Sequence, residues 1–367
     1  MPNIKTSKLP IYALFGFLYL LCSVYAMSYF FYNSSLGDKY IGGQMRFEEM
    51  VDGTARKPFV YRQLVPIIVR ALDQITPDAV REGGNQWVEG LKYRKNYKEL
   101  QQTMPWFFNT FPDKATHYIR LLGSLIIFGF WVGYMAGIFA LARAVMPSTP
   151  AVAFIAPLFA TVAFSSFGYQ WQYIYDIPCL CLSTACFYFL YTGRLRLYFL
   201  AFFLACLNKE TAIFSVIFFS IWCWDKMDDR KFGLLWGAQC IIYCVVKVSI
   251  SIYFMANDGS FLEINPGLML KRDLLAQANI HKVALVAVLW FLFTHHWQDK
   301  PEFLKKTLWL LPLFYAAYFF AGFPGEYRVF FDLHAPLILL ALHTLVVATG
   351  VAASPVFAPL QPDEGSS

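Results

Sequence analysis

The stretch ACLNKETAIF, residues 205–214, holds the feature on which the fold depends. It lies inside residues 197–224, where nearly every side chain is aliphatic or aromatic, yet Asn208, Lys209 and Glu210 stand together near the middle. A charge at the centre of a membrane helix costs roughly 2.5–3.5 kcal/mol on insertion scales. The segment is therefore either one span with a costly polar centre or two short half-spans joined by a polar turn.

The composition indicates a membrane protein. The chain has 367 residues, of which 58% are hydrophobic and only 15% are charged, whereas soluble domains carry about 25% charged residues. We therefore expect an all-α polytopic membrane protein. No Pro/Gly/Ser-rich linker divides residues 1–350, which predicts a single transmembrane domain. The tail 351–367 is rich in Pro and Ser and is predicted to be disordered.

Besides residues 197–224, about eight segments are predicted to span fully, because a span needs about 20 apolar residues. They are residues 10–32, 118–142, 150–167, 173–192, 232–255, 281–297, 307–321 and 328–350. A polar insertion, residues 33–117, follows the first of them. We expect it to carry amphipathic helices that lie in the membrane interface, the clearest within residues 56–77.

Lysine and arginine residues in short loops favour the cytoplasmic side of a membrane. Lys5, Lys8, Arg143, Arg194 and Arg196 fall on one side if the N-terminus is cytoplasmic. If residues 197–224 form two half-spans, six of the loop Lys/Arg residues that follow them lie inside and four lie outside. If they form one span, four lie inside and six outside. Both arguments favour the pair of half-spans.

In that topology the unusual polar clusters all lie on the extracytoplasmic face. They are the insertion 33–117, YQWQYIYD (169–176), LNKET (207–211) and GFPGEYR (322–328). Polar groups that gather at one membrane face predict a single site.

Several acids in these clusters are candidates for a catalytic base. Asp38 is the first acid after the first span, and Glu48 follows it in the same insertion. A carboxylate at a membrane–water edge can act as a general base when burial raises its pKa towards neutrality, although a solvated loop acid is the alternative. Asp176, at the outer start of a span, is either a functional intramembrane acid or a helix cap.

The cations in the same clusters are candidates for binding phosphate. Arg62 could be a bidentate donor to phosphate, or it could contact lipid headgroups without specificity. Lys209 is a compact cation that suits a phosphate, with Glu210 holding it in place, and the alternative is a Lys–Glu pair that shapes a turn. Glu326 and Arg328 lie at the mouth of the last span, as site residues or as an exposed ion pair.

Other site classes are not expected. All eight cysteines fall in apolar segments, and the Cys179/Cys181 pair has no second pair to complete a zinc site. We therefore predict no metal site. The net charge of +6 is modest and has no clustered basic face, so no nucleic-acid partner is expected.

Four features together resemble the multi-spanning glycosyltransferases of the GT-C type, which use sugars linked to polyprenyl phosphate. They are an acid-bearing loop after the first span with GDKY at 37–40, YRQLVP at 61–66, YIYD at 173–176, and LNKETA at 207–212 with a closing GEYR at 325–328.

The resemblance implies transfer of a sugar from a polyprenyl-phosphate donor to an extracytoplasmic glycan, lipid or protein acceptor, in a bacterial inner membrane. It leaves a divalent cation open as a cofactor. It assigns catalytic roles to Asp38, Asp176 and Glu326, and binding of substrate or phosphate to Tyr61, Arg62, Asn208, Lys209, Glu210 and Arg328.

Two other functions stay open at this point. A transporter or flippase for a lipid-linked or anionic solute would use the same charges along a substrate path, but such a path needs polar groups at both faces and in between. A structural or assembly partner without catalysis is the third hypothesis.

Overall fold

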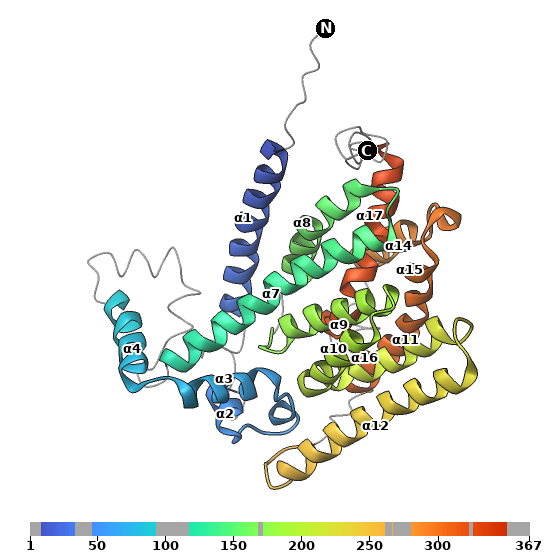
Figure 1. Ribbon diagram of the computed structural model, residues 1–367. Coiled ribbons are helices and arrows are strands. Elements are labelled where there is room, and N and C mark those ends of the chain that lie inside the picture. The colour runs from blue at the N-terminus through green and yellow to red at the C-terminus, as the bar shows by residue number, and fades with distance from the viewer. Residues whose placement is uncertain are drawn as a thin grey trace, which may run out of the picture.

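The structure is a computed structural model that describes residues 9–33, 46–92, 117–167, 172–260, 266, 280–322 and 326–350. Within these residues the chain is helical and forms no strand (Figure 1). Four helical segments are long and apolar enough to cross a membrane, namely Ala13–Phe31, His117–Val145, Asp229–Tyr253 and Tyr327–Ala348. These four segments indicate an all-helical membrane protein, as the composition predicts.

Each predicted span contains a helix, but several of these helices are short. In chain order the elements are α1 (Leu9–Asn33), α2 (Phe47–Asp52), η1 (Phe59–Tyr61), α3 (Leu64–Ile75), α4 (Asp78–Lys92), α7 (His117–Val145), α8 (Pro150–Phe167), α9 (Asp176–Tyr191), α10 (Leu195–Asn208), η3 (Glu210–Ala212), α11 (Ile213–Cys223), α12 (Asp229–Tyr253), α14 (Ile280–Thr294), η5 (Trp297–Asp299), α15 (Glu302–Thr307), η6 (Leu308–Leu310), α16 (Leu311–Ala321), η7 (Tyr327–Leu333) and α17 (His334–Ala348). Because only four described segments reach spanning length, the predicted count of eight full spans is not confirmed.

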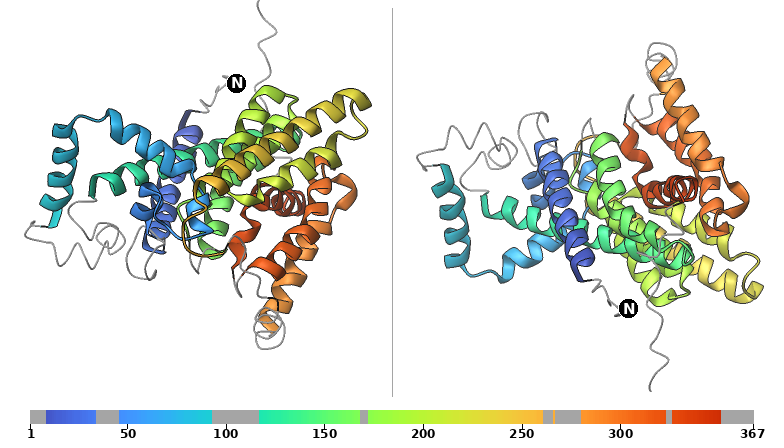
Figure 2. Two further views of the ribbon diagram at one scale, coloured as in Figure 1. Left: turned by 90° about the horizontal axis from the view of Figure 1, so that it is seen from below. Right: turned by 90° about the horizontal axis from the view of Figure 1, so that it is seen from above.

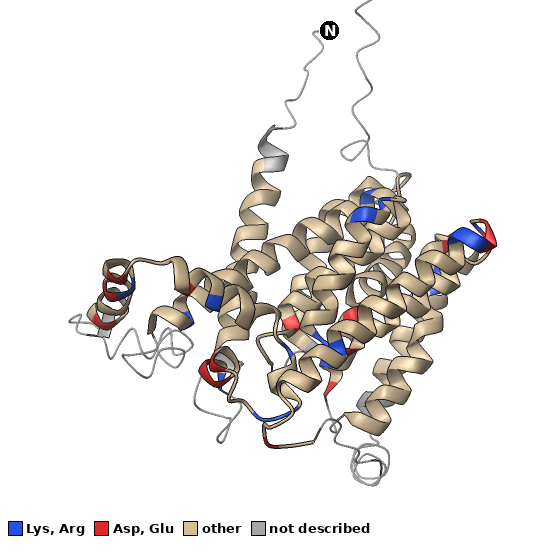
Figure 3. Cartoon of the chain, turned by 60° about the horizontal axis from the view of Figure 1, so that its bottom comes forward, with Lys and Arg blue, Asp and Glu red and all other residues tan. Residues whose placement is uncertain are grey.

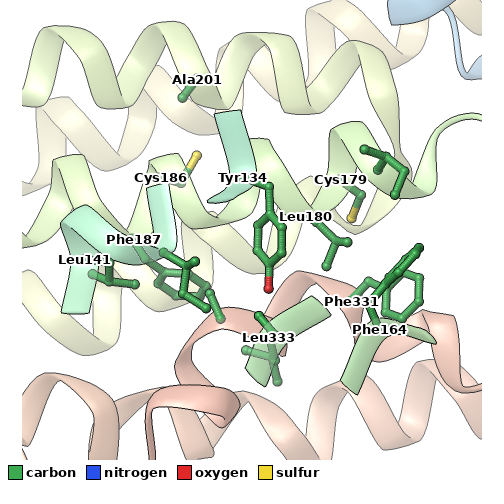
Figure 4. Packing of buried hydrophobic residues seen from close by; sticks show 14 of the residues in the cluster. Tyr134, Leu141, Phe164, Cys179, Leu180, Cys186, Phe187, Ala201, Phe331 and Leu333 are labelled. Carbon is green, nitrogen blue, oxygen red and sulfur yellow. The ribbon is translucent and has the colours of Figure 1, made fainter. Parts of the chain in front are cut away.

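The core is built around the contact between α7 and α9. Gly133 and Gly137 of α7 face Cys181 and Thr184 of α9, where an added Cβ would lie 2.8 Å and 3.2 Å from side-chain atoms. Small residues at such positions let two membrane helices approach closely. Helices α8, α10 and α17 complete the core. Figure 4 shows its buried side chains, among them Tyr134, Phe164, Phe187, Phe331 and Leu333.

Helices α10 and α11 fold back on each other. Lys209 ends α10 with an extended backbone, φ −152° and ψ 154°. The Tyr198 hydroxyl of α10 donates to the Ser215 carbonyl of α11 at 3.1 Å, and the Tyr198 ring packs on Phe219. In one continuous helix, Tyr198 and Ser215 would lie about 25 Å apart along the axis. The chain therefore reverses at this turn, in agreement with the predicted hairpin.

The described part of the insertion packs partly on the bundle. Leu64, Val65 and Val69 of α3 are buried, and α3 contacts α7 and α10. We expected the apolar face of this helix to enter the membrane interface, but much of that face is covered by protein, while Ile67 and Ile75 stay exposed. Helix α4 lies at the margin of the bundle in both views of Figure 2, where Asn85 Oδ1 accepts from the Tyr118 amide at the start of α7.

The turn that follows α12 is fastened to the loop that follows α2. Asn257 Nδ2 donates to the carbonyls of Gly53 and Ala55 at 2.8 Å and 2.9 Å, and the Lys57 amide donates to a carbonyl of the turn at 2.7 Å. Gly259 has φ +94°, and an added Cβ would lie 2.5 Å from the Lys57 carbonyl oxygen. Only glycine fits there, so this close approach of the two segments depends on Gly259.

We predict that Gly133→Ala destabilises the fold. The added methyl group would have to displace the Cys181 sulfur at the α7–α9 contact, and overpacking of this kind costs typically 1–3 kcal/mol. Gly129→Ala on the same helix is the matched control, because a Cβ added at Gly129 would have no neighbouring atom within 4 Å. Because alanine has a higher helix propensity than glycine, Gly129→Ala should leave the free energy of unfolding unchanged or raise it by up to about 1 kcal/mol. Thermal unfolding of both variants in detergent measures the difference, and equal melting temperatures would contradict the prediction.

Candidate functional site

Charged side chains from separate segments meet at one end of the bundle. They come from the loop before α3, the N-terminal ends of α9 and α11, the C-terminal parts of α10 and α12, and η7. Figure 3 shows acidic and basic positions between helices that are otherwise almost uncharged. We call this group the charge cluster, and it contains Arg62, Asp176, Lys209, Glu210, Lys247, Glu326, Arg328 and Asp332.

Arg62 joins the insertion to the turn of the hairpin. Its Nε and Nη2 both donate to Glu210 Oε2 at 3.4 Å, and its Nη1 donates to the Tyr175 hydroxyl. The guanidinium carbon lies 4.0 Å from the centre of the Tyr175 ring. Burial opposes the charge of Arg62, but the negative charge of Glu210 raises the pKa of Arg62 above its ordinary value. Arg62 therefore stays cationic at physiological pH.

Arg328 is the second buried guanidinium and lies against both of two stacked tyrosines. The rings of Tyr173 and Tyr175 are parallel with centroids 5.3 Å apart, and the Arg328 guanidinium carbon lies 4.2 Å from the Tyr173 ring centre. Its Nη1 donates to Asp176 Oδ1 at 3.3 Å and to the Tyr175 hydroxyl at 3.1 Å, and its Nη2 donates to Glu326. Both predicted acids are thus carboxylate partners of one arginine.

Asp176 does not cap its helix through a later amide. Its Oδ2 accepts from the Tyr173 amide at 2.8 Å, three residues earlier, and the side chain is fully buried. This bond holds the YIYD segment in a turn that sets the two tyrosine rings side by side. The Tyr175 hydroxyl accepts from Nη1 of Arg62 and from Nη1 of Arg328.

Asn208, which we predicted to bind substrate, forms a hydrogen bond to the protein backbone in this structure. Its Nδ2 donates to the Tyr175 carbonyl at 2.9 Å, and the carbonyl of Leu207 accepts from the Gln63 amide at 2.9 Å. These bonds fix the turn against the insertion and the tyrosine pair. Tyr61 is also buried, and burial raises its pKa.

Two members of the charge cluster were not found from the sequence. Asp332 Oδ2 accepts from the Thr211 hydroxyl at 2.8 Å and lies 4.0 Å from Lys209 Nζ. Lys247 is buried on α12. Asp332 comes one helical turn after Arg328 in an apolar run, and Lys247 is the only charge in the C-terminal half of α12. Both match the rule that an ionisable residue inside an apolar helix marks a site.

The cluster retains unused hydrogen-bonding capacity. Its four cations and four carboxylates sum to a formal charge of zero, and both arginines are matched by carboxylates. In contrast, Lys209 Nζ, Lys247 Nζ and Glu210 Oε1 are buried and have no hydrogen-bond partner among the described residues. A cavity of about 10 Å³, room for about one water molecule, adjoins the cluster at Asp332. Unsatisfied buried charges are costly, so the two lysines favour an anionic ligand.

The remaining predicted residues lie elsewhere. Asp38 falls outside the described residues, so its role as a base stays a prediction. Glu48, the other candidate in the insertion, pairs with the buried Arg120 and so ties α2 to α7. Within the described part of the chain, no group of three His, Cys, Asp or Glu side chains could hold a metal ion.

The chain matches no family model, no curated protein and no solved structure. The fold and the site therefore define it by class, as a helical membrane protein with a buried cluster of paired charges at one end of its bundle.

We predict that Arg62 and Glu210 are energetically coupled. Removing one partner of a buried ion pair leaves an uncompensated charge and typically costs 3–5 kcal/mol, reduced here because Glu210 is partly exposed. Glu210→Gln should therefore lower the melting temperature, and Arg62→Gln in the same chain should restore part of it. A double-mutant cycle should give a coupling of about 0.5–3 kcal/mol.

The exposed pair Lys306–Glu302, at 3.2 Å near the other end of the bundle, is the control for this cycle. A surface pair of this kind contributes about 0–1 kcal/mol. Equal couplings for the buried pair and the surface pair would contradict the structural role given to Arg62 and Glu210.

Proposed function

We propose that this chain is a membrane glycosyltransferase that moves a sugar from a polyprenyl-phosphate donor to an extracytoplasmic glycan, lipid or protein acceptor. The observation that carries the proposal is the charge cluster at the end of an apolar bundle, in which the buried Lys209 Nζ has no hydrogen-bond partner among the described residues. A phosphate at the end of a long apolar chain can supply the missing partner while its chain stays in the bilayer.

The distribution of basic residues supports an extracytoplasmic site. The end of the bundle opposite the cluster carries the loop and helix-end residues Arg143, Arg194, Arg196, Lys226, Arg230, Lys231, Lys305 and Lys306. Basic residues in short loops favour the cytoplasm. This supports a cytoplasmic N-terminus, with the cluster on the opposite face of what we propose is a bacterial inner membrane.

In the proposed reaction, the bond between the sugar carbon and the phosphate oxygen breaks as the acceptor oxygen bonds to that carbon. The phosphate leaves with negative charge, which Lys209 can stabilise because it is preorganised in a site that excludes water. Arg62 and Arg328 add positive charge beside it, fixed by their carboxylate partners and by the tyrosine rings. Asp38 remains the proposed base for the acceptor proton, and Asp176 and Glu326 hold Arg328 in place.

The transporter hypothesis has less support. A path through the bundle would need polar groups between the two ends. Apolar side chains such as Leu180, Phe187 and Leu333 are buried next to the cluster, and the buried polar Gln239 beyond it is bonded to Tyr198.

The lipid that co-purifies with the protein tests the proposal. Mass spectrometry of protein in mild detergent should detect polyprenyl phosphate or its glycosylated form with the wild type, and about tenfold less with Lys209→Ala, since a charged hydrogen bond contributes about 1.5–3 kcal/mol. Lys231→Ala, an exposed lysine at the other end of the bundle, should behave as wild type. Bulk phospholipid alone in all three samples would overturn the proposal.

The proposed base has its own test. Asp38→Asn should abolish sugar transfer, because an amide cannot accept the acceptor proton, and it should leave the co-purifying lipid unchanged. Transfer assays with the extracted lipid fraction as donor measure the first effect, and mass spectrometry measures the second. Retained turnover would move the role of base to Asp176 or Glu48, each of which is paired with an arginine in this structure.

A further inference from the structure

Helix α12 has two chemically different faces. Ile241, Val245, Val248 and Ile252 are exposed along one side, each by more than half of its surface. In a membrane protein this apolar side is in contact with lipid. The opposite side faces the hairpin of α10 and α11 and carries the polar residues.

The polar side forms a stripe at helical spacing, Gln239, Tyr243 and Lys247. Gln239 is fully buried and accepts from the Tyr198 hydroxyl at 2.7 Å. The Tyr243 hydroxyl donates to the Glu210 carbonyl at 3.0 Å. The first two residues of the stripe therefore bind the hairpin, and the third lies one helical turn closer to the end of the bundle that carries the charge cluster.

Lys247 differs from its two neighbours in the stripe because its polar group is unsatisfied. The residue is 9% exposed, and its Nζ has no hydrogen-bond partner among the described residues. The charged groups that act on it are Glu210 and Arg62. Oε2 of Glu210 is taken by Arg62, while Oε1 is also without a partner. A buried ammonium without a partner is unfavourable, so its retention here points to an anion that is bound in the working protein.

We propose that Lys247 binds the phosphate of the lipid-linked donor, and that the donor enters the charge cluster from the bilayer across α12. A ligand that suits both sides of this helix is amphiphilic, with a phosphate at Lys247 and an apolar chain along the exposed side. Lys247 then binds the phosphate from α12, beside Glu210 and Arg62, while the arginines stay with their carboxylates. This inference rests on the proposed glycosyltransferase function.

Binding of a polyprenyl monophosphate to the full-length protein in detergent tests the inference, with the corresponding polyprenol as the ligand that lacks phosphate. Lys247→Met should weaken binding of the monophosphate at least tenfold, and Lys247→Arg should stay within about threefold of wild type. Lys231→Met, on the same helix but exposed, should be unchanged. Equal binding by wild type and Lys247→Met would overturn the role of Lys247 and leave the proposed function standing. A wild type that does not distinguish the monophosphate from polyprenol would overturn both.

The melting temperature and competition by inorganic phosphate distinguish phosphate binding by Lys247 from a purely structural role and from a site for free phosphate. If Lys247 only balances Glu210, Lys247→Met should lower the melting temperature without ligand, whereas removal of an unpaired buried charge should leave it unchanged or raise it. A lower melting temperature together with full binding would overturn the inference. Inorganic phosphate should not displace the lipid at millimolar concentration, and full displacement would show that the site takes free phosphate rather than a lipid from the bilayer.

Discussion

The charge cluster depends on mutual neutralisation of buried ions around two stacked tyrosines. A single ion taken from water into a protein interior costs several kcal/mol. Arg62, Glu210 and Arg328 come from parts of the chain that are far apart in sequence, and each is tolerated only when its partner segment is in place. The loop before α3, the hairpin turn and η7 must therefore assemble together. The same constraint explains why the Asn208 side chain donates to the Tyr175 carbonyl, because the turn that presents Lys209 and Glu210 has to be fixed against the tyrosine pair.

Some of this arrangement could be predicted from the sequence alone. The reversal at Lys209 follows from a cost that acts on any chain, namely the insertion of adjacent charges into a membrane. The chain reverses direction at each connection between helices, so every second connection lies at the same end of the bundle. This places Arg62, Asp176 and Arg328 at one end. Neither argument requires knowledge of how the helices pack.

Other features depend on packing and could not be predicted. Whether Lys247 faces lipid or protein is set by the rotation of α12 about its axis, and the role of Asp332 is set by its distance from Thr211. The predicted number of full spans is not confirmed for a related reason. Helix α9 is buried along most of its length, so its apolar composition reflects contact with other helices as much as contact with lipid. An apolar composition indicates that a helix avoids water, but it does not distinguish contact with lipid from contact with other helices.

The contact between the turn after α12 and the loop after α2 has a mechanical consequence. Asn257 and Gly259 fasten the end of α12 to the segment that leads into Arg62. The helix that carries Lys247 and the loop that carries Arg62 are therefore joined to each other, and each is also joined to the hairpin, because the Tyr243 hydroxyl donates to the Glu210 carbonyl and the Gln63 amide donates to the Leu207 carbonyl. A displacement of α12 away from the hairpin would have to break these bonds as well as separate the charges. Hydrogen bonds to the backbone therefore hold both cations in register with Glu210.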